Sequence, residues 1–100
     1  MVKHIVMWQL KDEALGNPRS ANAELVKAKL EALEGRIPGL TRIEVGLDVS
    51  ATEASADVVL YSELDGPEAL ATYQSHPEHE AVKEFIGAVT EARWVADYRA

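Results

Sequence analysis

The run from Val2 to Lys11 is the part of the sequence that most restricts the fold. Valine, isoleucine and tryptophan, which favour β-strands, are concentrated in it. Alternate side chains of a strand point to opposite faces of a sheet, and both faces of this run carry large apolar residues. Val6 and Trp8 share one face, and Ile5 and Met7 share the other. A strand with one face in water would alternate more cleanly, so we expect both faces to be covered.

The remaining sequence alternates between helical and strand patterns. In chain order, the pattern predicts a helix over residues 18–36, strands over 43–49 and 57–64, a helix after Asp65 that is interrupted at Pro77 and resumes through Val89, and a strand over 93–98. Proline, glycine and small polar residues separate these segments. The charged residues of the first helix are expected to form its solvated face: Glu24, Lys27, Lys29, Glu31 and Glu34.

The resulting order, β-α-β-β-α-β, is that of the split βαβ or ferredoxin-like fold of the α+β class. Right-handed crossovers place both helices on one face of a four-stranded antiparallel sheet. The other face is then bare, and Ile5, Met7, Trp94 and Tyr98 are expected on it. Exposed apolar patches of this kind mark interfaces, so we expect a homodimer that packs sheet against sheet. No linker divides residues 1–100, which indicates one domain.

Charge and composition exclude several classes of function. The formal net charge of −7 argues against nucleic acid or an anionic membrane surface as the main partner. The chain has no cysteine, so thiolate chemistry is excluded. The amino terminus does not resemble a secretory signal, and no apolar run approaches the ~18 residues of a membrane span. A cytoplasmic location is therefore the default expectation.

The segment "YQSHPEHEAV" contains two of the three histidines of the chain. His76 precedes Pro77, which disfavours helical backbone at His76, so one helix should end there and another begin. His76 then lies near the N-cap and His79 in the first turn of the second helix. Tyr73 lies one turn before His76 and can share its helix face.

The spacing of residues in this segment is compatible with several chemical roles. The helix dipole favours a neutral His79, able to accept a proton, whereas the neighbouring Glu78 and Glu80 favour its charged form. A histidine–proline join with acidic neighbours can also be a surface corner. The least favoured hypothesis is a metal site, in which His4 and Asp57 would add to the ligands His76 and His79.

His4 and Asp57 extend the candidate site onto the sheet. His4 shares a strand face with Val6 and Trp8, where a histidine is most often a core residue. If the face that carries Asp57 also looks toward the helices, Asp57 and His4 converge with Tyr73 and His79. A buried Asp57 requires a partner, and His4 is a natural one.

Three segments resemble the stress-responsive A/B barrel (Dabb) proteins: "MVKHIVMWQLKDE", "VVLYSELDGPEALATYQSHPEHEAVKEFI" and "VADY". The resemblance covers nearly the whole chain, and its most specific parts are "VKH" and the "Y-x-x-HPEH" block. It implies a ferredoxin-like monomer that dimerises through its sheet into an α+β barrel. The antibiotic-biosynthesis monooxygenases are related to the family and share this architecture.

The resemblance also implies which residues form a site. A plant member of the family, olivetolic acid cyclase, closes a linear polyketide by an aldol condensation without a cofactor, in a pocket between sheet and helices. Its catalytic tyrosine and histidine match Tyr73 and His79, and a first-strand histidine of its site matches His4. A further histidine in its pocket falls at Asp57 here, which changes the charge of the site.

Two functions follow as hypotheses from the resemblance. The first is a stress-related homodimer that binds a small apolar, phenolic or polyketide-like molecule. The second is a cofactor-free cyclase or lyase in which His79 removes a proton next to a carbonyl and Tyr73 stabilises the enolate, oriented by His4 and Asp57. A monooxygenase is a weaker third hypothesis, and neither a metal nor another cofactor is expected. The predicted apolar pocket wall comprises Val26, Leu30, Val59 and Trp94.

Overall fold

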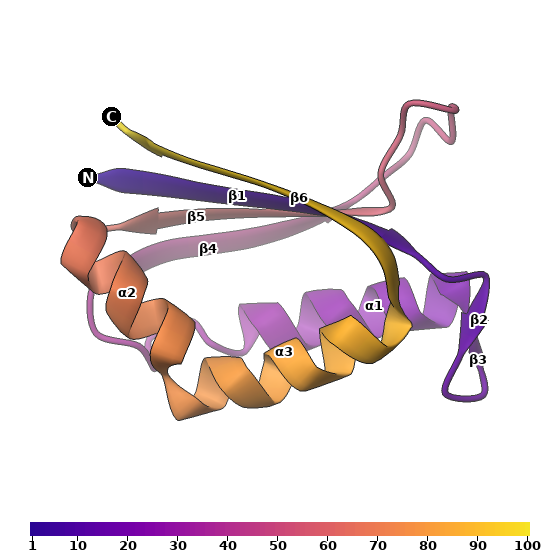
Figure 1. Ribbon diagram of the computed structural model, residues 1–100, viewed down its shortest axis with the longest axis horizontal. Coiled ribbons are helices and arrows are strands. Elements are labelled where there is room, and N and C mark those ends of the chain that lie inside the picture. Colours follow the sequence, from indigo (N-terminus) through magenta and orange to yellow (C-terminus); the bar gives the residue numbers. More distant parts are fainter.

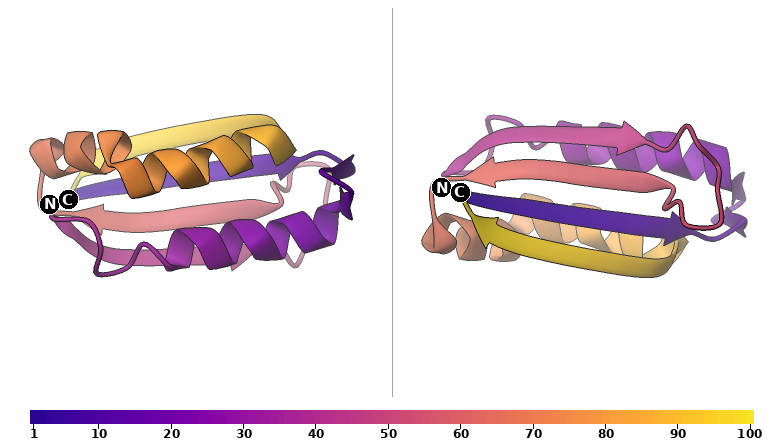
Figure 2. Two further views of the ribbon diagram at one scale, coloured as in Figure 1. Left: turned by 90° about the horizontal axis from the view of Figure 1, so that it is seen from below. Right: turned by 90° about the horizontal axis from the view of Figure 1, so that it is seen from above.

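The computed structural model describes residues 1–100 and contains a four-stranded antiparallel sheet with three helices on one face (Figures 1 and 2). The strands are β1 (Val2–Leu10), β4 (Leu40–Leu47), β5 (Val58–Leu64) and β6 (Thr90–Arg99), and the helices are α1 (Arg19–Glu31), α2 (Pro67–Ser75) and α3 (Pro77–Val89). Their spatial order, β4-β5-β1-β6, places β1 beside both β5 and β6. The predicted ferredoxin-like α+β fold is confirmed.

The connection between β1 and α1 contains a short hairpin that the sequence pattern does not predict. It consists of β2 (Glu13–Ala14) and β3 (Asn17–Pro18). Asn22, in α1, is fully buried, and its side-chain amide donates to the backbone oxygen of Ala14 at 3.0 Å. This hydrogen bond fixes the hairpin to the helix.

The first helix ends at Glu31, five residues before the predicted end at Arg36. A series of turns connects it to β4, and Gly35 adopts a φ of +75° within them. Leu33 and Ile37 are nevertheless buried in the core. Their apolar character extended the helical pattern in the sequence beyond the helix itself.

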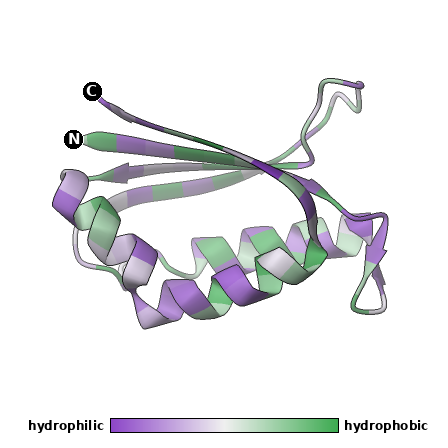
Figure 3. Ribbon diagram, in the orientation of Figure 1, coloured by the Kyte–Doolittle hydropathy of each residue, from purple (hydrophilic) through white to green (hydrophobic).

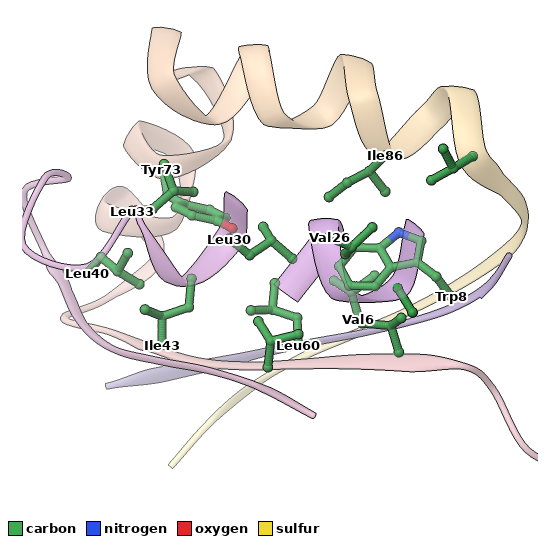
Figure 4. Close-up of a cluster of buried hydrophobic side chains, with 14 of the residues drawn as sticks. Val6, Trp8, Val26, Leu30, Leu33, Leu40, Ile43, Leu60, Tyr73 and Ile86 are labelled. Carbon is green, nitrogen blue, oxygen red and sulfur yellow. The ribbon is translucent and has the colours of Figure 1, made fainter. Parts of the chain in front are cut away.

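The hydrophobic core lies between the sheet and the helices (Figure 4). The even-numbered residues of β1 face it, as the alternation predicts, and Val6 and Trp8 are buried there with Leu60 of β5. The helices carry apolar and polar residues in alternation along their length, as Figure 3 shows. Not one of them is both long and apolar enough to cross a membrane.

Two charged residues of α1 contact the edge strand β4 instead of forming only a solvated face. The ammonium of Lys27 donates to the backbone oxygen of Val45 at 2.6 Å, and the Val45 N–H donates to the Glu31 carboxylate at 3.2 Å. Lys27 and Glu31 also pair with each other at 2.9 Å. The hydrogen bond from Lys27 lowers the pKa of Glu31, so its carboxylate remains ionised as an acceptor. The prediction of a purely solvated outer face is therefore wrong for these two residues.

The face of the sheet opposite the helices is uncovered in the single chain (Figure 2). Met7 is 42% exposed, and its register partners across β5 and β6 are Val59 and Trp94. Tyr98 is also largely exposed, and Ile5 is partly exposed beside Ala96. The predicted bare apolar face is therefore present, and we call the set Ile5, Met7, Val59, Trp94 and Tyr98 the open face.

Gly39 allows the turn before β4 to approach α2 closely. Its φ is +85°, and a Cβ placed there would lie 2.5 Å from the Cβ of Ala69. We expect Gly39→Ala to lower the free energy of unfolding by at least about 2 kcal/mol, from backbone strain and from the clash. Gly35→Ala is the matched control, because Gly35 has a similar φ but nothing within 4 Å. Urea denaturation followed by circular dichroism measures both, and equal losses would exclude the clash.

Candidate functional site

The junction between α2 and α3 is built on His76 and Pro77. His76 has extended backbone (φ −65°, ψ 133°), as expected before proline. It is the C-cap residue of α2 and also the N-cap residue of α3. Its Nδ1 accepts a hydrogen bond from the Glu78 N–H at 3.2 Å, which caps α3. The prediction that His76 lies at the N-cap is confirmed. The bend it produces brings the end of α2 and the start of α3 over the same part of the sheet.

His79, in the first turn of α3, is buried and points toward Tyr73. The centres of the two rings are 4.1 Å apart and their planes differ by 34°. The Nδ1 of His79 lies 3.3 Å from the backbone oxygen of Gln74. A carbonyl oxygen only accepts, so Nδ1 carries the hydrogen and Nε2 retains a free lone pair.

The protonation of His79 is decided by its burial. Burial lowers its pKa below 6.5, and the nearby positive charge of Lys83 acts in the same direction. The bond to Gln74 and the charge of Glu80 oppose this shift without reversing it. Of the two alternatives left open by the sequence, the neutral imidazole is therefore favoured at neutral pH.

Tyr73 is fully buried, and its hydroxyl has no hydrogen-bond partner within the chain. Burial raises the pKa of the phenol well above its usual value of 10.0, so the hydroxyl stays protonated. The ring also meets His4 edge to face, with ring centres 5.8 Å apart. Tyr73 therefore lies between the two histidines with an unused hydrogen-bond donor.

His4 is buried on the helix-facing side of β1, and its Nδ1 bonds to the carboxylate of Asp97. Asp97 is the register partner of His4 on β6, so sheet pairing brings the two together. The sequence interpretation did not single out Asp97. Its signal was available: Arg93, Val95 and Asp97 alternate on one face of β6, and the predicted topology places β6 beside β1.

A cavity of about 360 Å³ joins these residues, between the sheet and the helices. His4, Tyr73, His79 and Leu30 lie on its wall, and all four are among the site residues proposed from the sequence. The apolar part of the wall is formed by Val6, Trp8, Leu30, Leu60 and Ile86. Gln74, Lys83, Thr90 and Arg93 complete it and were not anticipated. The spacing of Lys83, one helical turn after His79, is the signal that could have identified it.

Four predicted binding residues do not line this cavity. Val59 and Trp94 belong to the open face, on the other side of the sheet. Val26 is fully buried in the core. These three assignments are corrected by the strand register and by packing.

Asp57 also lies away from the cavity, just before β5 and near the far end of β1. Its carboxylate accepts the Leu10 N–H at 2.7 Å and lies 3.8 Å from the guanidinium of Arg19. The carboxylate that partners His4 is Asp97, so the expected convergence of Asp57 with His4 does not occur. The four residues that the metal hypothesis required are likewise not brought together, and the structure contains no group of three or more histidine or carboxylate side chains placed to hold a metal ion.

Comparison with known families matches residues 2–100 to the model of the stress responsive A/B barrel domain. The chain belongs to the Dabb family. The fold described above is thus the fold of a Dabb domain. No curated protein sequence gives a significant match.

Solved structures similar to this Dabb domain include a dimeric protein of unknown function with a ferredoxin-like fold from Bacteroides fragilis. It is 33% identical, the alignment covers 99% of this chain and 95% of that one, and the TM-score is 0.86.

Two more distant structures show the same fold. A Dabb family protein from Mesorhizobium loti is 22% identical, with 99% and 95% of the two chains covered and a TM-score of 0.78. A hydroxynitrile lyase from Passiflora edulis is 20% identical, with 97% and 90% covered and a TM-score of 0.78. The fold therefore occurs in proteins that include an enzyme.

Proposed function

We propose that this Dabb protein is a homodimer that binds a small apolar molecule with a carbonyl or phenolic group in the cavity of His4, Tyr73 and His79. The observation that carries the proposal is the Tyr73 hydroxyl, which is buried without a hydrogen-bond partner. A buried polar group without a partner is costly and rare in folded proteins. A ligand oxygen placed beside it would accept its hydrogen bond.

The shape and lining of the cavity support a ligand of this kind. Small-molecule sites are mostly apolar concave spaces of roughly 300–1,000 Å³ with a few polar groups that fix orientation. The cavity measures about 360 Å³, and 6 of its 12 lining residues are hydrophobic. Three of its polar groups, those of His4, Tyr73 and His79, cluster where α2 meets α3. A ligand would therefore present its polar end to this cluster and its apolar body to Trp8 and Ile86.

Binding can be measured through Trp8, which lines the cavity. In a Trp94→Phe background, where Trp8 is the remaining tryptophan, para-pentylphenol is expected to change the fluorescence saturably. Tyr73→Phe should weaken binding by about threefold to tenfold, the usual value of one neutral hydrogen bond. Tyr61→Phe is the matched control, because the Tyr61 hydroxyl already donates to Glu63, away from the cavity. A response that does not saturate, or equal affinities for the Tyr73 and Tyr61 variants, would contradict the proposal.

A second function, proton transfer without a cofactor, is favoured by the opposite pKa shifts of His79 and Tyr73. Burial lowers the pKa of the imidazole and raises that of the phenol. At neutral pH the pair therefore contains one group that accepts a proton and one that donates a hydrogen bond. Titratable neighbours with divergent pKa values are typical of acid–base sites.

The proposed step begins with a substrate that has a C–H bond next to a carbonyl. His79 removes this proton at Nε2, and the electron pair of the C–H bond forms an enolate whose charge lies on the carbonyl oxygen. The Tyr73 hydroxyl donates a hydrogen bond to that oxygen and stabilises it. The enolate carbon then attacks a second carbonyl, as in an aldol closure, and the imidazolium returns its proton to the alkoxide that forms there. Alternatively, the enolate carbon regains the proton from the imidazolium. Asp97 holds His4 beside Tyr73, so His4 completes the polar cluster.

The homodimer is proposed to form through the open face. Burial of Met7, Trp94 and Tyr98 against a second copy would remove from water the largest apolar side chains that the fold leaves exposed on the sheet. A two-fold axis would allow the same face of each chain to contact the other. The cavity lies on the opposite side of the sheet, so both cavities would remain outside this interface. A cytoplasmic location and a monooxygenase activity remain predictions from the sequence.

A further inference from the structure

The charge of the cavity wall is opposite to that of the chain as a whole. The formal net charge is −7, yet Lys83 and Arg93 line the cavity and no aspartate or glutamate does. Clefts lined by one sign of charge attract ligands of the opposite sign. The wall is therefore unsuited to a cation and suited to an anion.

Arg93 lies away from the His4–Tyr73–His79 cluster, whereas Lys83 lies one helical turn after His79 on α3. Along β1, His4 and Trp8 are four residues apart, which corresponds to about 13 Å of strand. Asp97 is the β6 partner of His4, whereas Arg93 is the partner of Trp8. Figure 4 accordingly shows Tyr73 and Trp8 at opposite sides of the core cluster. The cavity therefore has a histidine–tyrosine end and an arginine end.

The positive charges are available to a ligand. Arg93 forms no ion pair in the chain, although Arg19, Arg36 and Arg42 each have a carboxylate partner. Lys83 has only a 3.5 Å contact with Glu80, and its side chain is 55% exposed. A guanidinium presents a planar set of donors that matches a carboxylate in two hydrogen bonds.

Thr90 supplies a second donor near Arg93. Its Oγ1 is buried, lines the cavity and has no hydrogen-bond partner in the chain. The buried, unpartnered hydroxyls of Tyr73 and Thr90 thus belong to the same cavity, and Thr90 pairs with Leu10 at the end of β1 beyond Trp8. A ligand with a polar group at each end would satisfy both.

We infer that the cavity binds a carboxylate-bearing ligand in one orientation, with the carboxylate at Arg93 and Thr90 and a carbonyl or phenolic group at Tyr73. This inference rests on the proposed function and specifies its ligand class. The reverse orientation is disfavoured, because the carboxylate of Asp97 lies beside His4 and repels a second anion. The matching ligand is an apolar body that separates the two polar groups by about 10 Å, slightly less than the four-residue span of β1.

The test compares gamma-(para-hydroxyphenyl)butyrate with its methyl ester, which has the same body without the charge. By isothermal titration calorimetry at pH 7.5 and low salt, the acid is expected to bind at least about tenfold more tightly than the ester. Arg93→Gln should remove most of this preference, measured as the ratio of the two affinities, and an unchanged circular dichroism spectrum shows that the variant is folded. Lys83→Gln should reduce the preference to a smaller degree, since Lys83 already contacts Glu80 and lies nearer to His79 than to Thr90 along α3 and β6.

Arg99→Gln is the matched control, because it removes the same charge from the same strand outside the cavity, and the preference should persist in it. Equal affinity of the wild type for acid and ester overturns the inference but leaves a binding pocket in place. Absence of binding by both compounds overturns the proposed function as well. A preference for the acid that survives in both Arg93→Gln and Lys83→Gln also overturns the inference, because the selectivity then has another source.

Discussion

Replacement of His79 by alanine is expected to slow proton removal next to a carbonyl by about 10²–10⁴-fold, the usual contribution of a positioned general base. The reason is that Nε2 of His79 has a free lone pair, since Nδ1 is bonded to the oxygen of Gln74, and the centre of its ring lies 4.1 Å from that of Tyr73. The measurement is deuterium exchange at the carbon between the carbonyls of a linear β-diketone, followed by nuclear magnetic resonance in heavy water. Wild type and His79→Ala are compared at equal concentration.

His76→Ala is the matched control for this prediction. It removes the neighbouring histidine, whose side chain caps α3 instead of lining the cavity. The control should retain exchange activity and lose only some stability, about 1 kcal/mol for a lost N-cap. Equal exchange by wild type and His79→Ala would remove His79 from the mechanism.

The pH dependence of deuterium exchange should reflect the lowered pKa of His79. Burial lowers its pKa, so the imidazole is still neutral at pH 6.5, where an exposed histidine would be half charged. Activity should therefore persist at pH 6.5 and decline only as the pH falls through a lower value. A decline centred above pH 6.5 would contradict a buried base.

Met7→Asp is expected to convert the proposed homodimer into a monomer. Met7 lies at the centre of the open face, between Val59 and Trp94, and a carboxylate there would lose its hydration on association without gaining a partner. The cost of burying an uncompensated charge is of order 3–5 kcal/mol, and a two-fold interface incurs it twice. Sedimentation equilibrium should show a change from the mass of two chains to 10.9 kDa.

Val49→Asp provides the control, because Val49 is 95% exposed in the segment after β4 and lies outside the open face. It introduces the same charge and should leave the dimer mass unchanged. A dimer that survives Met7→Asp at micromolar concentration would place the interface elsewhere. The structure of the cavity should be unchanged in both variants, because neither Met7 nor Val49 lines it.

The parts of the fold that depend on local pattern were predictable from the sequence. The alternation of β1 assigned His4, Val6 and Trp8 to the helix side, and the proline after His76 located the helix junction. Boundaries were less accurate where apolar residues stay buried after a helix ends, as Leu33 and Ile37 do. Apolar periodicity in a sequence indicates which residues are buried and not where a helix ends. Here buried residues continue through the turns that connect α1 to β4.

The site was only partly predictable, because its composition depends on strand register. Asp97 reaches His4 through the pairing of β6 with β1, a relation between residues 93 positions apart. The errors at Val59 and Trp94 have a different origin. Val58 and Leu60 already marked the buried face of β5, so Val59 had to face the other way. The assignment of Trp94 to the pocket contradicted its expected place on the bare face of the sheet.

The contact of Lys27 and Glu31 with Val45 has a consequence for how copies of this chain can associate. Edge strands are templates for the addition of further strands, and long open edges promote uncontrolled growth. In β4, both outward backbone groups of Val45 are already bonded to side chains of α1. A strand from another molecule would have to displace this ion pair before it could align along β4. Growth of a continuous intermolecular sheet is thereby obstructed at this edge, which favours association that ends with a closed pair.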